Sequence, residues 1–213
     1  MMKNYQHIVK RYTALTRGNK LHIFARLATV PWGQITDSFP RGETLIDIGC
    51  GHGLLINLLR ESKRFKKMIG IDPDENKIRI AQQAAGEGIS FFQRDLVTLA
   101  EGADVYSIFD VLYLIPFDQQ EAIMRHIFKR LPKNGYLIIK EVNNKPGWKF
   151  SFLRFQESIM VKLLHFTKGK DFYFRSEEEY DKLLKEIGFS VSVKYLDRGF
   201  LYPHILYVCK KIR

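Results

Sequence analysis

The stretch from Thr44 to Arg60, TLIDIGCGHGLLINLLR, constrains the fold more than any other part of the chain. Strand-like residues over 44–49 run into three glycines within five residues, and an apolar helical pattern follows at once. Glycine weakens both helices and strands, so such a cluster indicates a tight turn whose bare backbone must approach something closely. We expect a buried strand over 44–49, a glycine loop, and an amphipathic helix over 53–65.

Strand and helix patterns alternate along the chain after this loop. Because helices between successive strands act as crossovers, the pattern predicts a doubly wound α/β sheet of mostly parallel strands. The strands are almost continuously apolar, which is typical of strands covered on both faces. We expect further strands over 67–72, 89–95, within 103–115 and over 134–142, and helices over 75–85 and 120–131.

The last part of the chain combines one helix with two strands. Ser176 and Glu179 form a capping-box pattern and Gly188 follows the apolar periodicity, so a helix is expected over 176–189. The strands expected over 190–196 and 204–211 are joined too briefly for a parallel crossover, which predicts a hairpin.

Length and composition indicate a single globular domain. The chain has 213 residues, of which 46% are hydrophobic and 27% charged, as in soluble proteins. Two cysteines, Cys50 and Cys209, provide neither a disulfide framework nor a zinc ligand set, so a reducing cytoplasm is expected. We divide the domain into an N-terminal helical lid (1–40), a ligand-binding core (41–142), a helical insertion (143–175) and a final helix and hairpin (176–213).

The net charge of +11 is unevenly distributed. Residues 1–36 contain six cations and no acid, and the stretch 145–175 contains seven cations against Glu157 and Asp171. A basic excess can attract nucleic acid, anionic lipid or an acidic small molecule, or can serve only solubility.

The spacing of the glycine loop bears on which ligand it holds. A dinucleotide-binding loop requires G-x-G-x-x-G/A, but the sixth position counted from Gly49 is Leu54. Asp47 stands immediately before the loop, where its carboxylate would repel a pyrophosphate. The loop therefore argues against NAD and favours a zwitterionic ligand that carries an amino acid.

With these residues in view, the chain resembles the class I (Rossmann-like) S-adenosylmethionine-dependent methyltransferases over about 42–142. LIDIGCGHG, IGIDPD, FFQRDL, DVLYLIP and LPKNGYLIIKE are similar to successive motifs of that family, in order and at the right spacings. The resemblance implies a seven-stranded sheet with an antiparallel last strand. It also implies S-adenosylmethionine as cofactor and S-adenosylhomocysteine as product.

The resemblance assigns cofactor-binding roles to residues at the ends of strands. Asp72 is expected to accept both ribose hydroxyls, Asp95 to bind the adenine amino group, and Asp47 to hold the methionine part. The alternative roles are a helix N-cap for Asp72 and a solvated turn for Asp95. The full expected set is Asp47, Ile48, Gly49, Cys50, Gly51, Gly53, Asp72, Pro73, Arg94, Asp95, Leu96 and Asp110.

Catalytic groups are harder to assign from sequence. Methyl transfer from a sulfonium is an in-line displacement, and a base is needed only if the acceptor must lose a proton. Asp110, Tyr113 and His204 are our candidates, with Glu141 and Tyr173 as further possible bases. Asp110 could instead be a cap, Tyr113 a pocket wall and His204 a strand-start residue. Cys50 and His52 have no spaced ligand partners, so no metal is expected.

Motifs that the chain lacks disfavour some classes of methyl acceptor. The D/N-P-P-aromatic motif of nucleic-acid amino-methylating relatives is replaced by Asp110-Val111-Leu112-Tyr113. The base-C5 methylating relatives need a nucleophilic cysteine directly after the strand expected within 103–115, and neither Cys50 nor Cys209 is there. We expect a small or lipid-like acceptor, acidic or aromatic, with peripheral membrane contact as an option. RNA or protein methylation through the basic face, and cofactor binding without turnover, are the alternatives.

Overall fold

The computed structural model describes residues 5–12, 15–95, 102–143 and 172–212. Its centre is a seven-stranded sheet in the order β3-β2-β1-β4-β5-β7-β6. β7 runs antiparallel to its neighbours β5 and β6, and all other pairs are parallel. The strands are β1 (Thr44–Ile48), β2 (Lys67–Asp72), β3 (Ile89–Gln93), β4 (Val105–Phe109), β5 (Tyr136–Val142), β6 (Phe189–Tyr195) and β7 (His204–Lys211).

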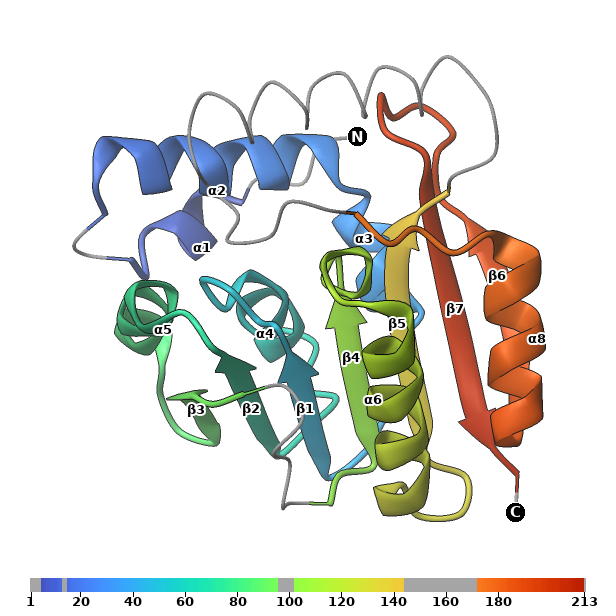
Figure 1. The fold of residues 1–213 in the computed structure, drawn as a ribbon. Coiled ribbons are helices and arrows are strands. Elements are labelled where there is room, and N and C mark those ends of the chain that lie inside the picture. The colour runs from blue at the N-terminus through green and yellow to red at the C-terminus, as the bar shows by residue number, and fades with distance from the viewer. Residues whose placement is uncertain (1–4, 13–14, 96–101, 144–171, 213) are drawn as a thin grey trace.

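Helices cover both faces of the sheet (Figure 1). Successive residues of a strand point to opposite faces of the sheet, so they belong to two separate hydrophobic cores. In β1, Leu45 packs with the helix layer on one face and Ile46 with the helix layer on the other. The first layer contains α3 (Trp32–Asp37), α4 (Leu54–Arg60), α5 (Glu75–Ala81) and the short η1 (Gln82–Ala84). The second contains α6 (Phe117–Arg130) and α8 (Glu177–Ile187), with η2 (Leu112–Leu114) following β4. The helices α1 (Gln6–Val9) and α2 (Arg17–Thr29) lie over the edge of the sheet where the parallel strands end.

The predicted architecture is confirmed in its main features. The sheet is doubly wound with an antiparallel last strand, and β6 and β7 form the expected hairpin. The capping box of α8 is present, since the Ser176 hydroxyl accepts from the Glu179 backbone N–H and the Glu179 carboxylate accepts from that of Ser176. Gly188 ends this helix in the left-handed conformation.

Three helix boundaries were wrong. The helix expected over 75–85 ends as an α-helix at Ala81, and the 3-10 turn η1 follows it. The helix expected over 53–65 ends at Arg60, because the Ser62 hydroxyl donates to the Leu59 carbonyl and Lys63 takes a positive φ of 48°. The helix expected over 120–131 already begins at Phe117, since Pro116 supplies a fixed φ that suits a helix entry. Most of the insertion expected over 143–175 lies outside the described residues.

The three glycines that follow β1 each take a left-handed backbone conformation, but for different reasons. A Cβ at Gly49 (φ +71°) would lie 2.4 Å from Val111, and one at Gly53 (φ +74°) would lie 2.5 Å from the Phe91 ring. A Cβ at Gly51 (φ +54°) would meet no atom within 4 Å. Packing therefore requires glycine at the first and third positions, whereas at Gly51 the backbone borders open space.

This difference predicts unequal effects of alanine substitution. Gly53→Ala is expected to lower the free energy of unfolding by about 2–4 kcal/mol, because the methyl group would overlap a ring in addition to straining the backbone. Gly51→Ala, the matched control, is expected to cost about 1–2 kcal/mol from backbone strain alone. Denaturant-induced unfolding without any cofactor measures both. Equal losses would show that the contact with Phe91 is not a packing constraint.

Candidate functional site

The carboxyl edge of the sheet contains a topological switch point. The chain leaves β1 toward β2 on one side, and later returns to place β4 on the other side. Open α/β sheets bind ligands in the crevice that such a reversal creates beyond the strand ends. The glycine loop follows β1 at this point, and Asp72 and Asp110 lie at the ends of the two neighbouring strands.

Asp72 holds the glycine loop in place while it keeps free acceptor capacity. One carboxylate oxygen accepts from the Gly51 backbone N–H (2.9 Å) and the other from the Asp74 backbone N–H (2.9 Å). A carboxylate offers about four acceptor sites, so roughly one on each oxygen is left for a ligand. The N-cap of α5 is Asp74, whose side chain accepts from Asn76 and Lys77, and not Asp72. The N-cap role, which was the alternative expectation for Asp72, is therefore fulfilled by Asp74.

Asp47 is a buried residue of β1, close to the start of the glycine loop. It pairs in register with Ser107 of β4, whose hydroxyl donates to the Asp47 carboxylate at 2.6 Å. Burial raises the pKa of Asp47 to about 7, with Asp72 adding to the rise and the Ser107 hydrogen bond opposing it. A buried carboxyl group in this state would gain by the approach of a cationic ligand group.

The other expected cofactor residues are spread along the same edge. Ile48 is a buried strand residue, and the backbone N–H groups of Gly49 and Cys50 both donate to the Ile71 carbonyl. Pro73 is exposed beside Asp72. Arg94 lies over the Phe92 ring and donates its backbone N–H to the Asp72 carbonyl, which places the start of the β3 loop beside β2. Asp95 is exposed, and Leu96 lies outside the described residues.

Asp110 is held by two cations. It follows β4 with a positive φ of 56°, its carboxylate contacts the buried Lys140 ammonium of β5, and it lies 2.8 Å from the Arg26 guanidinium of α2. Burial alone would raise the pKa of Asp110, but Lys140 and Arg26 hold it below its ordinary range. Burial also lowers the pKa of Lys140, and Asp110 opposes that shift. Asp110 is therefore a fixed carboxylate rather than a proton acceptor.

Glu141 and His204 lie beside this ion pair in uncharged forms. Burial, with the negative charge of Asp110, raises the pKa of Glu141 to about 8, and its carboxyl oxygen accepts from the Leu112 backbone N–H. His204 Nε2 lies 2.9 Å from the Thr29 carbonyl, so that nitrogen carries the proton. Burial and the Lys140 charge lower the pKa of His204 to about 3. Both groups are neutral near pH 7.

Tyr113 belongs to an aromatic cluster after β4. Its ring stacks on Phe174 at a centroid distance of 5.1 Å and lies 6.0 Å from Phe172. The Tyr173 backbone N–H donates to the Tyr113 carbonyl, and the Gln120 side-chain amide donates to the carbonyl of Tyr173. The structure thus brings Tyr113 and Tyr173 together on an aromatic wall.

The N-terminal helices contact the site directly. The Tyr12 hydroxyl donates to the His52 carbonyl in the glycine loop and accepts from the Asn57 side chain. The rings of His22 and His52 lie 5.4 Å apart, and burial lowers the pKa of each to about 4. The N-terminal segment therefore contacts the glycine loop at more than one point, and its role as a lid stays a prediction.

Arg26 and Lys140 were missed by sequence reasoning. Lys140 gives a signal, since it is a lysine within the apolar strand YLIIKEV, and such a lysine requires a buried partner. Arg26 gives none, because it is one of several cations on a helix. Among the described residues, no group of three or more histidine, cysteine or acidic side chains is arranged to hold a metal ion.

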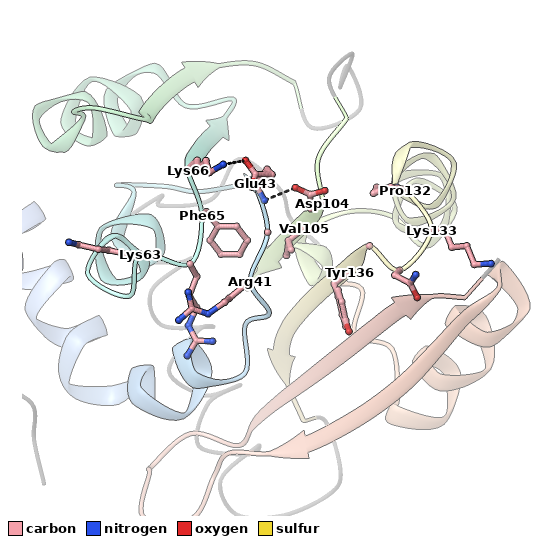
Figure 2. A pocket seen from close by; sticks show the side chains of 14 residues that line it. Arg41, Glu43, Lys63, Phe65, Lys66, Asp104, Val105, Pro132, Lys133 and Tyr136 are labelled. Carbon is pink, nitrogen blue, oxygen red and sulfur yellow. Dashed lines mark hydrogen bonds and ion pairs between the residues drawn. The ribbon is translucent and has the colours of Figure 1, made fainter.

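A hollow of about 680 Å³ lies at the opposite, amino edge of the sheet (Figure 2). At its mouth the Lys66 ammonium pairs with Glu43, and the Asp104 carboxylate accepts from the Glu43 backbone N–H. Arg41, Phe65 and Tyr136 also line it. Because strands β1, β4 and β5 begin here, this hollow is separated from the glycine loop by the length of the sheet.

The raised pKa of Glu141 predicts how stability depends on pH. Between about pH 5 and 8 the unfolded state releases this proton and the folded state keeps it, so the contribution of Glu141 to wild-type stability falls as pH rises. Glu141→Gln cannot titrate, so its free energy of unfolding relative to wild type should rise by about 1–3 kcal/mol over that range. Denaturation series at several pH values measure this. The exposed Glu87→Gln controls for loss of a carboxylate, and a pH-independent difference for Glu141→Gln would contradict the assignment.

Comparisons with known proteins agree with this geometry. Desmethylxanthohumol 6'-O-methyltransferase of Humulus lupulus is 28% identical over 81% of the chain and 50% of its own length. The chain spans between 39% and 60% of the length of the curated relatives it matches. A methyltransferase structure from Thermotoga maritima aligns over 97% of both chains, with 21% identity and a TM-score of 0.67. Magnesium protoporphyrin IX methyltransferase of Synechocystis, with bound S-adenosylhomocysteine, aligns over 97% of this chain and 94% of its own, with 20% identity and a TM-score of 0.63.

The sequence pattern of one family decides the classification. The family described as "Methyltransferase domain" matches residues 11–192, which is most of the chain and includes every strand from β1 to β5. The sheet order and the antiparallel β7 agree with this family's fold. The chain therefore belongs to the class I S-adenosylmethionine-dependent methyltransferases.

Proposed function

We propose that this protein transfers the methyl group of S-adenosylmethionine to a small-molecule acceptor at the carboxyl edge of the sheet. The observation that carries the proposal is the geometry of Asp72. Its carboxylate fixes the Gly51 and Asp74 backbones and keeps roughly one acceptor site on each oxygen, which suits a pair of ribose hydroxyls. The open space over Gly51 leaves room for the ligand against the backbone.

The methionine part of the cofactor would lie near Asp47. When bound, S-adenosylmethionine supplies a methyl group already activated by a positively charged sulfur. Asp47 is buried and lies next to the loop, so its carboxyl group can stabilise a cationic ligand. Asp95, which follows β3, is our candidate for the adenine, and Pro73 and Arg94 are candidates for further cofactor contacts because both lie beside Asp72.

The chain's own residues would mainly align the reactants and exclude water. Asp110 is locked by Lys140 and Arg26, and His204 is neutral with a lowered pKa, so neither is a strong base near pH 7. Glu141 retains its proton and holds the backbone of Leu112. These groups therefore favour an acceptor that reacts without a strong protein base, with alignment as the main contribution.

We propose an acidic or aromatic acceptor. The stacked wall of Tyr113, Phe172 and Phe174 suits a planar ring, and the guanidinium of Arg26 contributes positive charge at the end of β4. Relatives named for desmethylxanthohumol and caffeic acid are consistent with this choice. The hollow, which is lined by the cations Arg41, Lys63, Arg64, Lys66 and Lys133, lies on the opposite edge, so it does not present a nucleic acid to the methyl-transfer site. Cys50 and Cys209 are free thiols. A reducing cytoplasm stays our prediction for the cellular location of the protein.

The role of Asp72 predicts a specific loss of cofactor affinity. Asp72→Asn should weaken binding of S-adenosylmethionine and S-adenosylhomocysteine about 10- to 100-fold, because the amide loses charge and half of its acceptor capacity. Calorimetric titration measures this directly. Asp74→Asn is the matched control, since it removes one charge two residues away and asparagine still caps α5.

Thermal unfolding of both variants separates binding from folding. Asp72 also holds two backbone N–H groups, so a folded Asp72→Asn variant is needed for the comparison. Wild-type affinity in that variant, or an equal loss in Asp74→Asn, would refute the assignment of the ribose site.

A further inference from the structure

Exposed large apolar side chains are concentrated at the carboxyl edge of the molecule. Leu21 and Phe24 lie on α2, Leu114 and Phe117 follow β4, and Leu201 lies in the β6–β7 turn. Phe92 and Tyr195 are at the carboxyl ends of their strands, and among the described residues only Ile212 is an exposed large apolar side chain at the other edge. This edge therefore combines the methyl-transfer site with the apolar part of the surface.

The outer face of α2 is the most exposed part of this surface. Leu21 is 72% exposed and Phe24 is 44% exposed, and the exposed Ala25 and Ala28 continue the same stripe at helical spacing. Another face of the helix packs Ile23 and Leu27 into the core, so the exposed apolar residues are not needed to anchor the helix.

This apolar stripe is accompanied by positive charge alone. α2 contains no acidic residue, and the chain has none before Asp37. Arg17 and Lys20 are exposed, and neither forms an ion pair within the described ranges. Exposed leucine and phenylalanine side chains can insert into a membrane interface, while the long cationic side chains next to them reach the lipid phosphates.

We propose that the outer face of α2, defined by Arg17, Lys20, Leu21 and Phe24, docks on an anionic phospholipid bilayer. A protein partner fits less well, because a stable interface needs about 800 Å² on each side, and two large side chains with two alanines supply only part of that area. A bilayer requires no such area, since a few inserted side chains and electrostatic attraction act together. The described residues contain no helix long and apolar enough to cross a membrane.

Docking through α2 would orient the methyl-transfer site toward the lipid. The same helix places Arg26 against Asp110 and the Thr29 carbonyl against His204. Docking through its outer face would therefore put the site directly behind α2, on the side of the molecule that faces the bilayer. A lipid-dissolved acceptor could then reach the strand ends without crossing water. This consequence depends on the proposed function, whereas the docking itself does not.

The test is a vesicle flotation assay with the full chain and no cofactor. Phosphatidylcholine vesicles with and without phosphatidylglycerol are compared for wild type and three double variants. Leu21→Ser with Phe24→Ser removes the apolar part, and Arg17→Gln with Lys20→Gln removes the charge. Arg41→Gln with Lys133→Gln removes the same two residue types from the exposed amino edge, near the hollow in Figure 2.

Wild type should bind the anionic vesicles and bind the neutral ones much more weakly. The apolar double variant should bind anionic vesicles about tenfold more weakly than wild type. For the α2 charge variant the loss of binding should be at least about tenfold. The amino-edge variant should keep its binding to within about twofold, because those cations face away from the bilayer. All substituted side chains are exposed, and circular dichroism melting checks that the variants fold.

Three results would overturn the proposal. They are no binding of wild type to anionic vesicles, unchanged binding of the apolar variant, and an equal loss in the amino-edge variant. The last would show attraction by net charge rather than docking through α2. Calorimetry with S-adenosylhomocysteine on the same variants reports on the cofactor site separately, so failure of docking and failure of the proposed function can be distinguished.

Discussion

The Asp72 carboxylate holds together the segments on which the site depends. It bonds the backbone of the glycine loop after β1 and that of the turn after β2, so two parallel strand ends are joined by one side chain. Within this loop, Gly49, Gly51 and Gly53 all adopt left-handed conformations. Val111 and Phe91 pack against the first and last of them, and the space over the middle one stays open. Side chains therefore fill the space next to Gly49 and Gly53, whereas the backbone of Gly51 stays accessible to a ligand.

A second constraint is the cluster of buried charges at the end of β4. Asp110 is balanced by Lys140 within the sheet and by Arg26 from α2, so the helix that covers the site is joined to it by charge. A buried carboxylate would be costly without these partners. Because α2 carries this contact on one face and exposed Leu21 and Phe24 on another, it connects the site to the outer surface.

The sequence was most informative where the pattern is local. Apolar runs, the glycine spacing and the Ser176–Glu179 cap predicted the strands, the loop and α8, because each depends on neighbouring residues. Asp110 could be placed at a strand end, but not its pairing with Arg26, which is distant in the chain and depends on how α2 packs. Likewise, the neutral state of His204 follows from burial and from the nearby Lys140 charge, and neither can be read from its position at the start of a strand.

A crystal structure of the protein with S-adenosylhomocysteine would test the central claim most directly. We predict the ligand at the carboxyl edge, with both ribose hydroxyl oxygens within about 3 Å of the Asp72 carboxylate and the amino-acid part beside Asp47 and Gly49. Density for the ligand in the amino-edge hollow, or at the carboxyl edge without contact to Asp72, would contradict it.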